Sequence, residues 1–422
     1  MSVSGLRQTA YDRLGQRFFY GWVMLVVAGI GIFASGPGQS HTFSVFLGPL
    51  SRELDLDRTW LAAAYGLATA VAAFGLPLVG RIVDKRGPRD TTLVVALLLG
   101  LACVLFSMVG NVVVLALAFV SLRFLGQGSL MLNCSNLVAQ WFQRRRGFAM
   151  SLMGLGFSAS MAIHPPAAQW LVENIGWREA WLVLAASTWL LLLPAFGFFV
   201  FNRPEDVGLR PDGDAALAAG ETAPAIAGFT LHQALRMRAF YIVCGGMFSI
   251  SMLVTALHFY QVEILVSQGL APEVPARVFP VSALTMVLAM PLIGRMLDRL
   301  PTHFIFAGAL LIMASALVAV TFVRDIPSAI AYAVLFGILN GTSMSMFGFL
   351  WARYFGRKHL GSIQGTGQMI LVIGASLGPL PFGIAYDLTG SYGETLVLFA
   401  ALPATLAVLA ALLLRPSTLP VD

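Results

Sequence analysis

Arg123 is the residue whose chemistry and position say most about this sequence. It lies within an apolar stretch, next to Val120, Phe124 and Leu125. A guanidinium at the centre of a bilayer costs at least about 2.5–3.5 kcal/mol on the insertion scale, so it must face a protein interior and be paired. Two interpretations stay open. In the functional interpretation, Arg123 anchors an anionic substrate or acts as a switch near a proton path. In the structural interpretation, it donates hydrogen bonds to backbone carbonyls between helices.

Titratable side chains inside apolar stretches are few. They are His41, His164, His258 and Glu263, and Glu263 lies in the outer part of its stretch. A histidine titrates near physiological pH, so it can carry a proton or donate to a carboxylate. For His41 and His164 we favour the alternative, a histidine bonded to helix backbone. A proton-coupled carrier needs a titrating group in its path, and Glu263 or the histidines are the candidates.

Uncharged amides supply further candidates for a polar cavity. A buried amide in lipid needs partners or water, and it can equally hold two helices together. Gln364 and Gln368 are four residues apart and share one helix face. The predicted substrate-binding amides are Asn133, Asn136, Asn340, Gln364 and Gln368.

Several other kinds of chemistry are not expected. No group of His, Cys, Asp and Glu has metal-ligand spacing. The three cysteines are far apart in apolar runs, which argues against a disulfide framework. No nucleophile–base pair or phosphate-binding loop is visible. The sequence therefore predicts no enzyme activity, no metal and no cofactor.

The elements that position these residues follow from composition. The chain has 422 residues, of which 58% are hydrophobic and 11% are charged. A soluble protein has about 25% charged residues, and a bilayer-spanning helix needs about 20 apolar residues. We predict twelve spans, near residues 19–48, 59–82, 91–110, 112–139, 147–172, 177–200, 239–265, 276–297, 303–323, 327–351, 361–386 and 392–414.

Basic residues predict the orientation of these spans. Most of the 26 Lys and Arg residues fall in alternate gaps, so both termini and the middle loop are expected in the cytoplasm. The net charge of +6 is explained by this topology, and no nucleic-acid partner is expected. The gap at 202–238 is rich in Ala, Gly, Asp and Pro from Pro211 to Gly228, which predicts a flexible linker between domains 1–201 and 239–422.

Two short sequences recur at nearly one spacing. Gly80-Arg81-Ile82-Val83-Asp84-Lys85 is similar to Gly294-Arg295-Met296-Leu297-Asp298-Arg299, 214 residues later. Trp141-Phe142-Gln143-Arg144 is similar to Tyr354-Phe355-Gly356-Arg357, 213 residues later. Span n therefore matches span n + 6, as in parallel six-helix repeats.

These motifs resemble those of a known family. The segment from Gly80 to Arg89 resembles the loop between helices two and three of the major facilitator superfamily, and Arg123 with Gln127 and Gly128 resembles its fourth-helix motif. Residues 203–213 and 353–363 resemble the bacterial monocarboxylate and oxalate/formate transporter-like branch. The resemblance implies an all-α membrane protein of twelve transmembrane helices in two six-helix bundles.

The resemblance also implies roles for particular residues. The loop motif implies a conformational latch, in which Asp84 faces the positive end of a neighbouring helix. Helix seven borders the cavity in this family, which favours a functional role for His258 in substrate binding or proton coupling. The predicted latch residues are Gly80, Asp84, Arg86, Gly87 and Asp298.

One departure from the family narrows the expected substrate. Residues 278–293 and 363–384 carry no charged side chain. The resembled oxalate/formate antiporters have cations in helices eight and eleven, and the resembled monocarboxylate carriers have an Asp and an Arg in helix eight. A dicarboxylate is thus disfavoured. We expect a monomeric secondary active transporter in the cell membrane that moves a small organic anion, such as a monocarboxylate, by alternating access, with proton coupling open. The alternative is a multidrug or metabolite exporter with an apolar aromatic pocket.

Overall fold

Long apolar helices make up the protein. In a computed structural model, residues 8, 11–13, 15, 18–55, 58–214, 226–271 and 274–415 are described. Ten of the described helices are long and apolar enough to cross a membrane, and Gly21–Ala34 and Ala63–Ala73 are shorter apolar helices. In lipid a helix satisfies its own backbone hydrogen bonds, which is why apolar runs of this length fold as helices.

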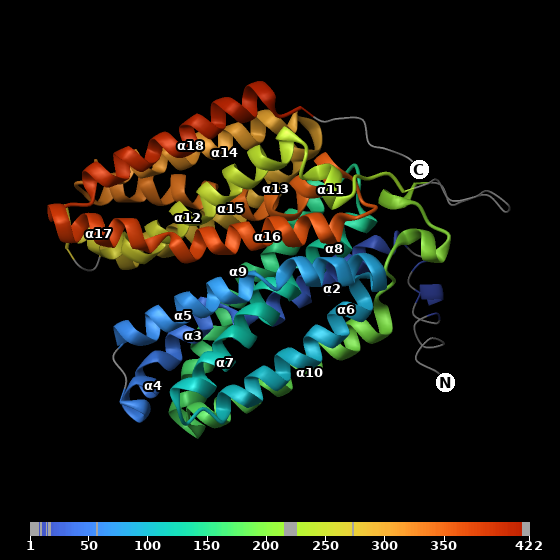
Figure 1. Ribbon diagram of the computed structural model, residues 1–422, viewed down its shortest axis with the longest axis horizontal. Helices are drawn as coiled ribbons and strands as arrows, with labels where there is room; N and C mark the ends of the chain where they lie inside the picture. The colour runs from blue at the N-terminus through green and yellow to red at the C-terminus, as the bar shows by residue number, and fades with distance from the viewer. Residues whose placement is uncertain are drawn as a thin grey trace.

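The helices form two groups, which Figure 1 shows one above the other. The first group holds α2 (Gly21–Ala34), α3 (Ser40–Phe43), α4 (Leu47–Leu54), α5 (Arg58–Ala73), α6 (Leu76–Ser107), α7 (Val112–Leu122), α8 (Met131–Trp141), α9 (Arg146–Ile175) and α10 (Trp177–Phe199). The second holds α11 (Leu231–Ala234), α12 (Arg238–Ser267), α13 (Val274–Arg299), α14 (Thr302–Val320), α15 (Ile326–Phe355), α16 (Leu360–Leu377), α17 (Pro379–Thr389) and α18 (Gly393–Leu413).

Breaks in the helices explain how these elements make twelve spans. The first span is interrupted by a 3-10 turn at Gly36–Gly38, and the second runs from α5 into the first part of α6. Gly87, at φ +82°, breaks α6 so that its remainder is the third span. The fourth span joins α7 to α8 through a π-helical segment, Arg123–Leu130, and the eleventh joins α16 to α17. The predicted fold class is confirmed.

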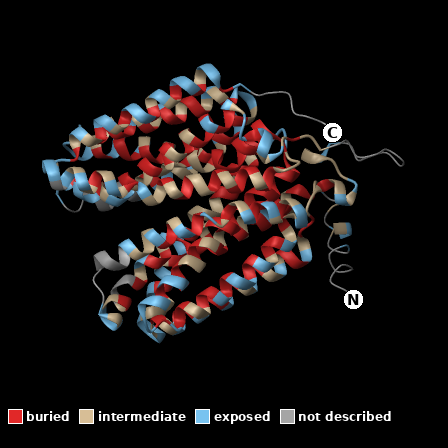
Figure 2. Cartoon of the chain, viewed as in Figure 1, coloured by how far each residue is buried: buried red, intermediate tan, exposed pale blue. Residues whose placement is uncertain are grey.

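Buried residues lie along the inside of each group, and exposed residues lie on outer helices such as α10 and α18 (Figure 2). Many large apolar side chains on those outer faces are exposed, including Leu190, Leu398 and Leu412. This is the distribution expected of a protein whose outer surface meets lipid.

Two pairs of glycines bring the groups into contact at one end. Gly80 on α6 meets Gly361 on α16, and a Cβ at Gly80 would overlap the carbonyl of Gly361. Gly294 on α13 meets Gly147 on α9, where a Cβ at Gly147 would lie 2.5 Å from the Gly294 oxygen. The two pairs are related by the 214-residue repeat. We call this the crossing end, and the opposite end, with α4 and α17, the far end. The helix groups diverge toward the far end (Figure 1).

The flanks of the middle loop are held against the crossing end. The Asp212 carboxylate accepts hydrogen bonds from the backbone amides of Gln143, Arg144 and Arg145, and Glu205 pairs with Arg357 at 2.5 Å. Ala227 accepts a backbone hydrogen bond from Arg357 at 3.0 Å. The composition predicted a flexible linker from Pro211 to Gly228. Its two flanks instead make specific contacts, while 215–225 lie outside the described residues.

A methyl group at the first crossing should open it. We expect Gly80→Ala to destabilise the closed arrangement by about 1–3 kcal/mol, because the overlapping atom is backbone and cannot rotate away. Nitroxide labels at Arg86 and Arg299, which are both exposed, should move apart in double electron–electron resonance measurements.

Gly308→Ala is the matched control for this experiment. Gly308 is also a helical glycine, on α14, but a Cβ there meets nothing within 4 Å. Its distance distribution should equal that of the wild type. An unchanged distribution in Gly80→Ala would show that the crossing is not limited by glycine contact.

Candidate functional site

The π-helical segment Arg123–Leu130 positions the predicted anion-binding residue. Its Gly126 lies against Gly38 of the broken first span, and a Cβ on Gly126 would approach the Gly38 Cα to 2.7 Å. This close contact turns the Gly38 carbonyl toward Arg123. π-Helical turns are rare and often lie at functional sites because they redirect side chains.

Arg123 is 5% exposed and is held by neutral groups. Its Nε donates to Thr69 Oγ1 and its Nη1 to the Gly38 carbonyl, each at 2.9 Å. Ser40 Oγ lies 3.5 Å from Nη1, and the guanidinium carbon lies 4.8 Å from the centre of the Tyr65 ring. None of these partners is a carboxylate. The guanidinium is therefore hydrogen-bonded, but its charge is not neutralised by these partners.

A chain of hydrogen bonds joins the two histidines of this group. His41 Nε2 lies 3.2 Å from Ser160 Oγ, and Ser160 Oγ lies 3.1 Å from His164 Nδ1. His164 Nδ1 also lies 3.2 Å from the Ser160 carbonyl, the kind of backbone bond that the sequence favoured. His41, in contrast, bonds through its ring to a side chain on another span. Arg123 and His164 are both within electrostatic reach of His41.

His258 and Glu263 lie apart from Arg123, in the second group. His258 Nδ1 is 2.9 Å from the Val254 carbonyl, one turn earlier on α12, and its ring packs on Phe336. Glu263 accepts a hydrogen bond from the Tyr392 hydroxyl at 2.7 Å. Five residues separate the two, so they point about 140° apart around the helix.

Glu263 borders a pocket of about 500 Å³ whose other lining residues are Tyr260, Gly383, Tyr386 and Tyr392. Tyrosine rings are common where a membrane protein meets the water interface. The structure therefore does not bring the two proton-coupling candidates of the sequence together, nor does it place either beside Arg123.

The five predicted amides divide between helix backbone and the contact between groups. Asn133 and Asn340 each donate to the carbonyl four residues earlier, at 2.8 Å. Gln364 donates to Ser135 Oγ and so links α16 to α8. Among the five predicted amides, the buried atoms without a hydrogen-bond partner in the described part of the chain are Asn133 Oδ1, Asn136 Nδ2, Gln364 Oε1 and Gln368 Oε1.

These four unpaired atoms share a setting. They lie on α8 and α16, helices that are in contact. Buried amide atoms in proteins usually have a protein or water partner, so these atoms are candidates for contact with water or a polar solute. Asn133, Asn136, Gln364 and Gln368 are thus buried here and Asn340 is half-buried, and lining an open cavity stays a prediction for all five.

Two carboxylates connect the groups at the crossing end. Asp84 accepts from the backbone amides of Gly361 and Ser362, both at 2.7 Å, and from the Ser362 hydroxyl. Asp298 accepts from the amides of Gly147 and Phe148, at 2.6 and 3.0 Å. Each carboxylate thus faces the first turn of a helix, where unpaired amides and the helix dipole favour negative charge.

The rest of the loop motif shapes the chain around Asp84. Gly87 has a positive φ, and a Cβ there would overlap the amide of Asn202. Asn202 Oδ1 accepts from the Arg89 backbone amide at 2.9 Å. Arg86 is exposed. Both Asp84 and Gly87 make contacts that require their residue types, and the latch role of the five residues stays a prediction.

Comparison with known proteins identifies the family. The model of the Major Facilitator Superfamily matches residues 21–275 and 264–421. The chain belongs to this superfamily. It is therefore a multi-pass membrane transporter and not an enzyme.

Relatives within the superfamily are distant. Over 380 residues, 80% of this chain and 82% of the relative, it is 26% identical to the probable sulfoacetate transporter SauU of Cupriavidus necator. It is 22% identical to human monocarboxylate transporter 2, over 88% of this chain and 81% of that protein. An uncharacterized 38 kDa protein of Thermoproteus tenax is 25% identical over 92% of this chain and 94% of its own length.

A solved structure shares the fold. The human organic anion transporter MFSD10 (TETRAN) superposes with a TM-score of 0.71 at 15% sequence identity, covering 92% of this chain and 99% of that one. The shared arrangement supports the twelve-helix fold alone.

Some residues of the site were missed from the sequence. Thr69, Tyr65 and Ser160 contact Arg123 or the histidines, and none was singled out. Thr69 and Ser160 are polar residues inside predicted spans, which is a weak signal because such hydroxyls usually bond their own helix. Their role depends on which helices are neighbours in space.

Loss of either carboxylate charge should loosen the crossing end. We expect Asp84→Asn and Asp298→Asn to weaken closure by similar amounts, because the two contacts are repeats of each other. Hydrogen bonds to a charged group contribute about 1.5–3 kcal/mol. A cysteine introduced at Ser135, which is buried, should react faster with a water-soluble maleimide in both variants.

Asp90→Asn is the control, since Asp90 is 56% exposed and pairs with the neighbouring Arg89. The maleimide rate should not change in that variant. If the maleimide reaction in both Asp84→Asn and Asp298→Asn is as slow as in the protein with both aspartates, the latch hypothesis is wrong.

Proposed function

We propose that the protein is a secondary active transporter of a small organic anion with a single carboxylate or a similar acidic group. The observation that carries this proposal is the Arg123 guanidinium, which is 5% exposed and is hydrogen-bonded to Thr69 and Gly38 without a carboxylate among these partners. A buried charge without a counter-ion is strongly unfavourable. An anion that enters from the open side would supply the missing charge.

The surroundings of Arg123 support access for such an anion. Ser40 is exposed, and His41 and Tyr65 are half-buried. The Tyr65 hydroxyl donates to Ser40 Oγ at 3.1 Å, so the two hydroxyls and the guanidinium form one polar surface. A carboxylate there could accept charge-assisted hydrogen bonds, which are about twice as strong as neutral ones.

The named relatives support the substrate class. One is described as a probable sulfoacetate transporter and another as a monocarboxylate transporter. Both names denote small acids with one carboxylate that are anionic at neutral pH, and sulfoacetate carries a sulfonate as well. Identities of 22–26% leave the acid itself open, and Arg123 provides a feature that a carboxylate or a sulfonate would use.

We further infer the orientation and the state of the transporter. We infer that the protein lies in the cell membrane. The distribution of its basic residues indicates that both termini are in the cytoplasm. The crossing end then faces the cytoplasm, the far end faces outward, and the structure represents an outward-facing state. We expect a monomer, and the predictions of proton coupling through His258 or Glu263 stay open.

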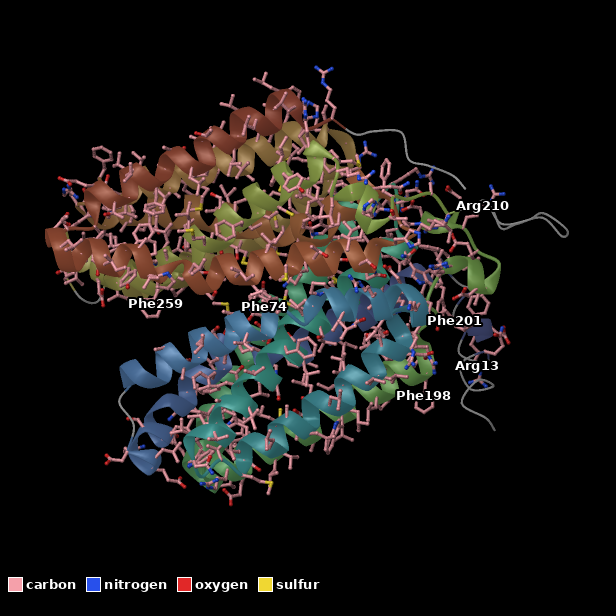
Figure 3. The ribbon with its side chains drawn as sticks, in the orientation of Figure 1. Arg13, Phe74, Phe198, Phe201, Arg210 and Phe259 are labelled. Atoms are coloured by element: carbon pink, nitrogen blue, oxygen red, sulfur yellow. The ribbon has the colours of Figure 1, made fainter. Side chains whose placement is uncertain are left out.

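One observation favours the alternative of an exporter for apolar solutes. Phe74, 68% exposed, and Phe259, 60% exposed, lie on the facing edges of the two groups (Figure 3). Aromatic rings on such edges could bind an apolar or cationic solute. The same binding screen distinguishes this possibility from the leading proposal.

Ligand binding to the purified protein tests the proposal. L-lactate, acetate and sulfoacetate should raise the melting temperature, and tetraphenylphosphonium should not, because binding to the folded state alone adds about 2.7 kcal/mol at a hundredfold excess over Kd. Arg123→Gln should lose the acid-dependent shift and uptake of labelled lactate into proteoliposomes. Arg123→Lys, which keeps the charge without the planar fork, should retain part of the binding.

Arg299→Gln removes an exposed arginine and is the matched control. Its acid-dependent shift should equal that of the wild type. Full lactate uptake in Arg123→Gln would end the anchor hypothesis, and a shift with tetraphenylphosphonium alone would favour the exporter.

A further inference from the structure

We propose that His41, Ser160 and His164 form a proton-binding relay whose occupancy is linked to the anion at Arg123. This inference rests on the proposed function and adds the residues that would couple a proton to it. The geometry that carries it is the continuous hydrogen-bonded chain from His41 Nε2 through Ser160 Oγ to His164 Nδ1, at 3.2 and 3.1 Å.

Each histidine nitrogen in this chain faces a group that suits both protonation states. Ser160 Oγ can accept from a protonated His41 Nε2 or donate to a neutral one, since a hydroxyl has one donor and two acceptor sites. His164 Nδ1 lies near the Ser160 hydroxyl and also near the Ser160 carbonyl. The hydroxyl can donate to the bare nitrogen, and the carbonyl can accept from the protonated one.

Proton transfer along this chain balances without any other reactant. His41 gives its Nε2 proton to Ser160 Oγ, and Ser160 gives its own hydroxyl proton to His164 Nδ1. The net result is that His41 loses one proton and His164 gains one, while the serine is unchanged. His41 is half-buried and His164 is 7% exposed, so the chain runs from the accessible side into the bundle.

The groups around the relay do not neutralise the positive charge of a protonated His41 or His164. Arg123 of the fourth span and His164 of α9 act on His41 electrostatically, and the Tyr65 hydroxyl of α5 donates to Ser40, the residue before His41. Phe157 contacts the edge of His41, and His164 packs on Phe33 and the backbone at Gly36. No carboxylate is among the recorded partners of either ring in the described part of the chain.

Electrostatics then links proton and anion. Arg123 Nη1 lies 3.5 Å from the Oγ of Ser40, the residue before His41, so a proton on His41 adds a second positive charge near Arg123. Like charges disfavour each other. An anion bound at Arg123 removes that repulsion and favours the proton. By thermodynamic reciprocity the proton favours the anion by the same factor. Proton–anion symport would follow from this linkage.

The relay is better placed for coupling than the two residues singled out in the second group. His258 bonds to its own helix at Val254, and Glu263 bonds to Tyr392 at the far end. Neither residue contacts Arg123, so an anion bound at Arg123 would not directly change the protonation of His258 or Glu263.

Calorimetry on the purified full chain tests the linkage. Titrations with L-lactate, and separately with sulfoacetate, in buffers of different ionisation enthalpy give the number of protons taken up per anion bound. For the wild type we expect net proton uptake and an affinity that rises about tenfold as the pH falls from about 7 to about 5, within the 5–150-fold range of common couplings. The window lies below the ordinary histidine range because the Arg123 charge disfavours the proton until the anion binds. In His41→Gln and in His164→Gln, the ratio of the affinity at the lower pH to the affinity at the higher pH should fall toward one for each acid.

Ser160→Ala separates the relay from the histidines themselves. It keeps both titrating rings, so lactate-linked proton uptake at equilibrium should persist while lactate uptake driven by a pH gradient slows in proteoliposomes. His232→Gln, an exposed histidine on α11, should keep the wild-type ratio of affinities. Because the readout is a ratio, a change in absolute lactate affinity does not obscure it.

The possible failures are distinct. If lactate or sulfoacetate binds the wild type with the same affinity at both pH values, the proposed function stands and the relay is wrong. The relay is also overturned if the pH dependence survives in His41→Gln and His164→Gln and disappears in His258→Gln. If neither acid binds at either pH, the proposed function fails and the relay falls with it.

Discussion

The structure of the first group is arranged around the positive charge of Arg123, which is buried within the fourth span. Arg123 needs acceptors where the membrane offers none, and the first two spans provide them. The Gly36–Gly38 turn frees the Gly38 carbonyl from its helix, and Thr69 turns its hydroxyl toward the guanidinium. The fourth span adds a π-helical turn at the same depth. Irregular backbone of this kind is tolerated in a membrane only where protein or a cavity satisfies it.

The contacts at the crossing end have the opposite character. They join two groups that must separate during transport, and they use few atoms. Each group contributes one aspartate and one helix N-terminus, so Asp84 with α16 and Asp298 with α9 form a reciprocal pair. Close glycine contacts bring these polar groups within reach.

Much of this architecture could be predicted from sequence because it depends on local or repeated patterns. Apolar length predicts the spans, and the 214-residue repeat places Asp84 and Asp298 at equivalent positions. The partners of Arg123 could not be predicted, because Thr69 and Gly38 reach it through helix packing. Gln364 and Asn136 were expected near a cavity, yet they are buried in this state. Their burial depends on the conformation of the transporter, which a sequence does not specify. The ion pair of Glu205 with Arg357 could not be predicted either, because it joins segments 152 residues apart that meet only in the folded chain.

The position of the connections has a consequence for chain order. α2 begins and α18 ends at the crossing end, where the flanks of the middle loop also lie (Figure 1). The described ends of the two groups are thus on one face of the molecule. The order of the halves in the chain is not needed to define their packing. A circularly permuted chain, with the second half leading, retains the same membrane-embedded contacts, since exposed connections on one side tolerate such rearrangement.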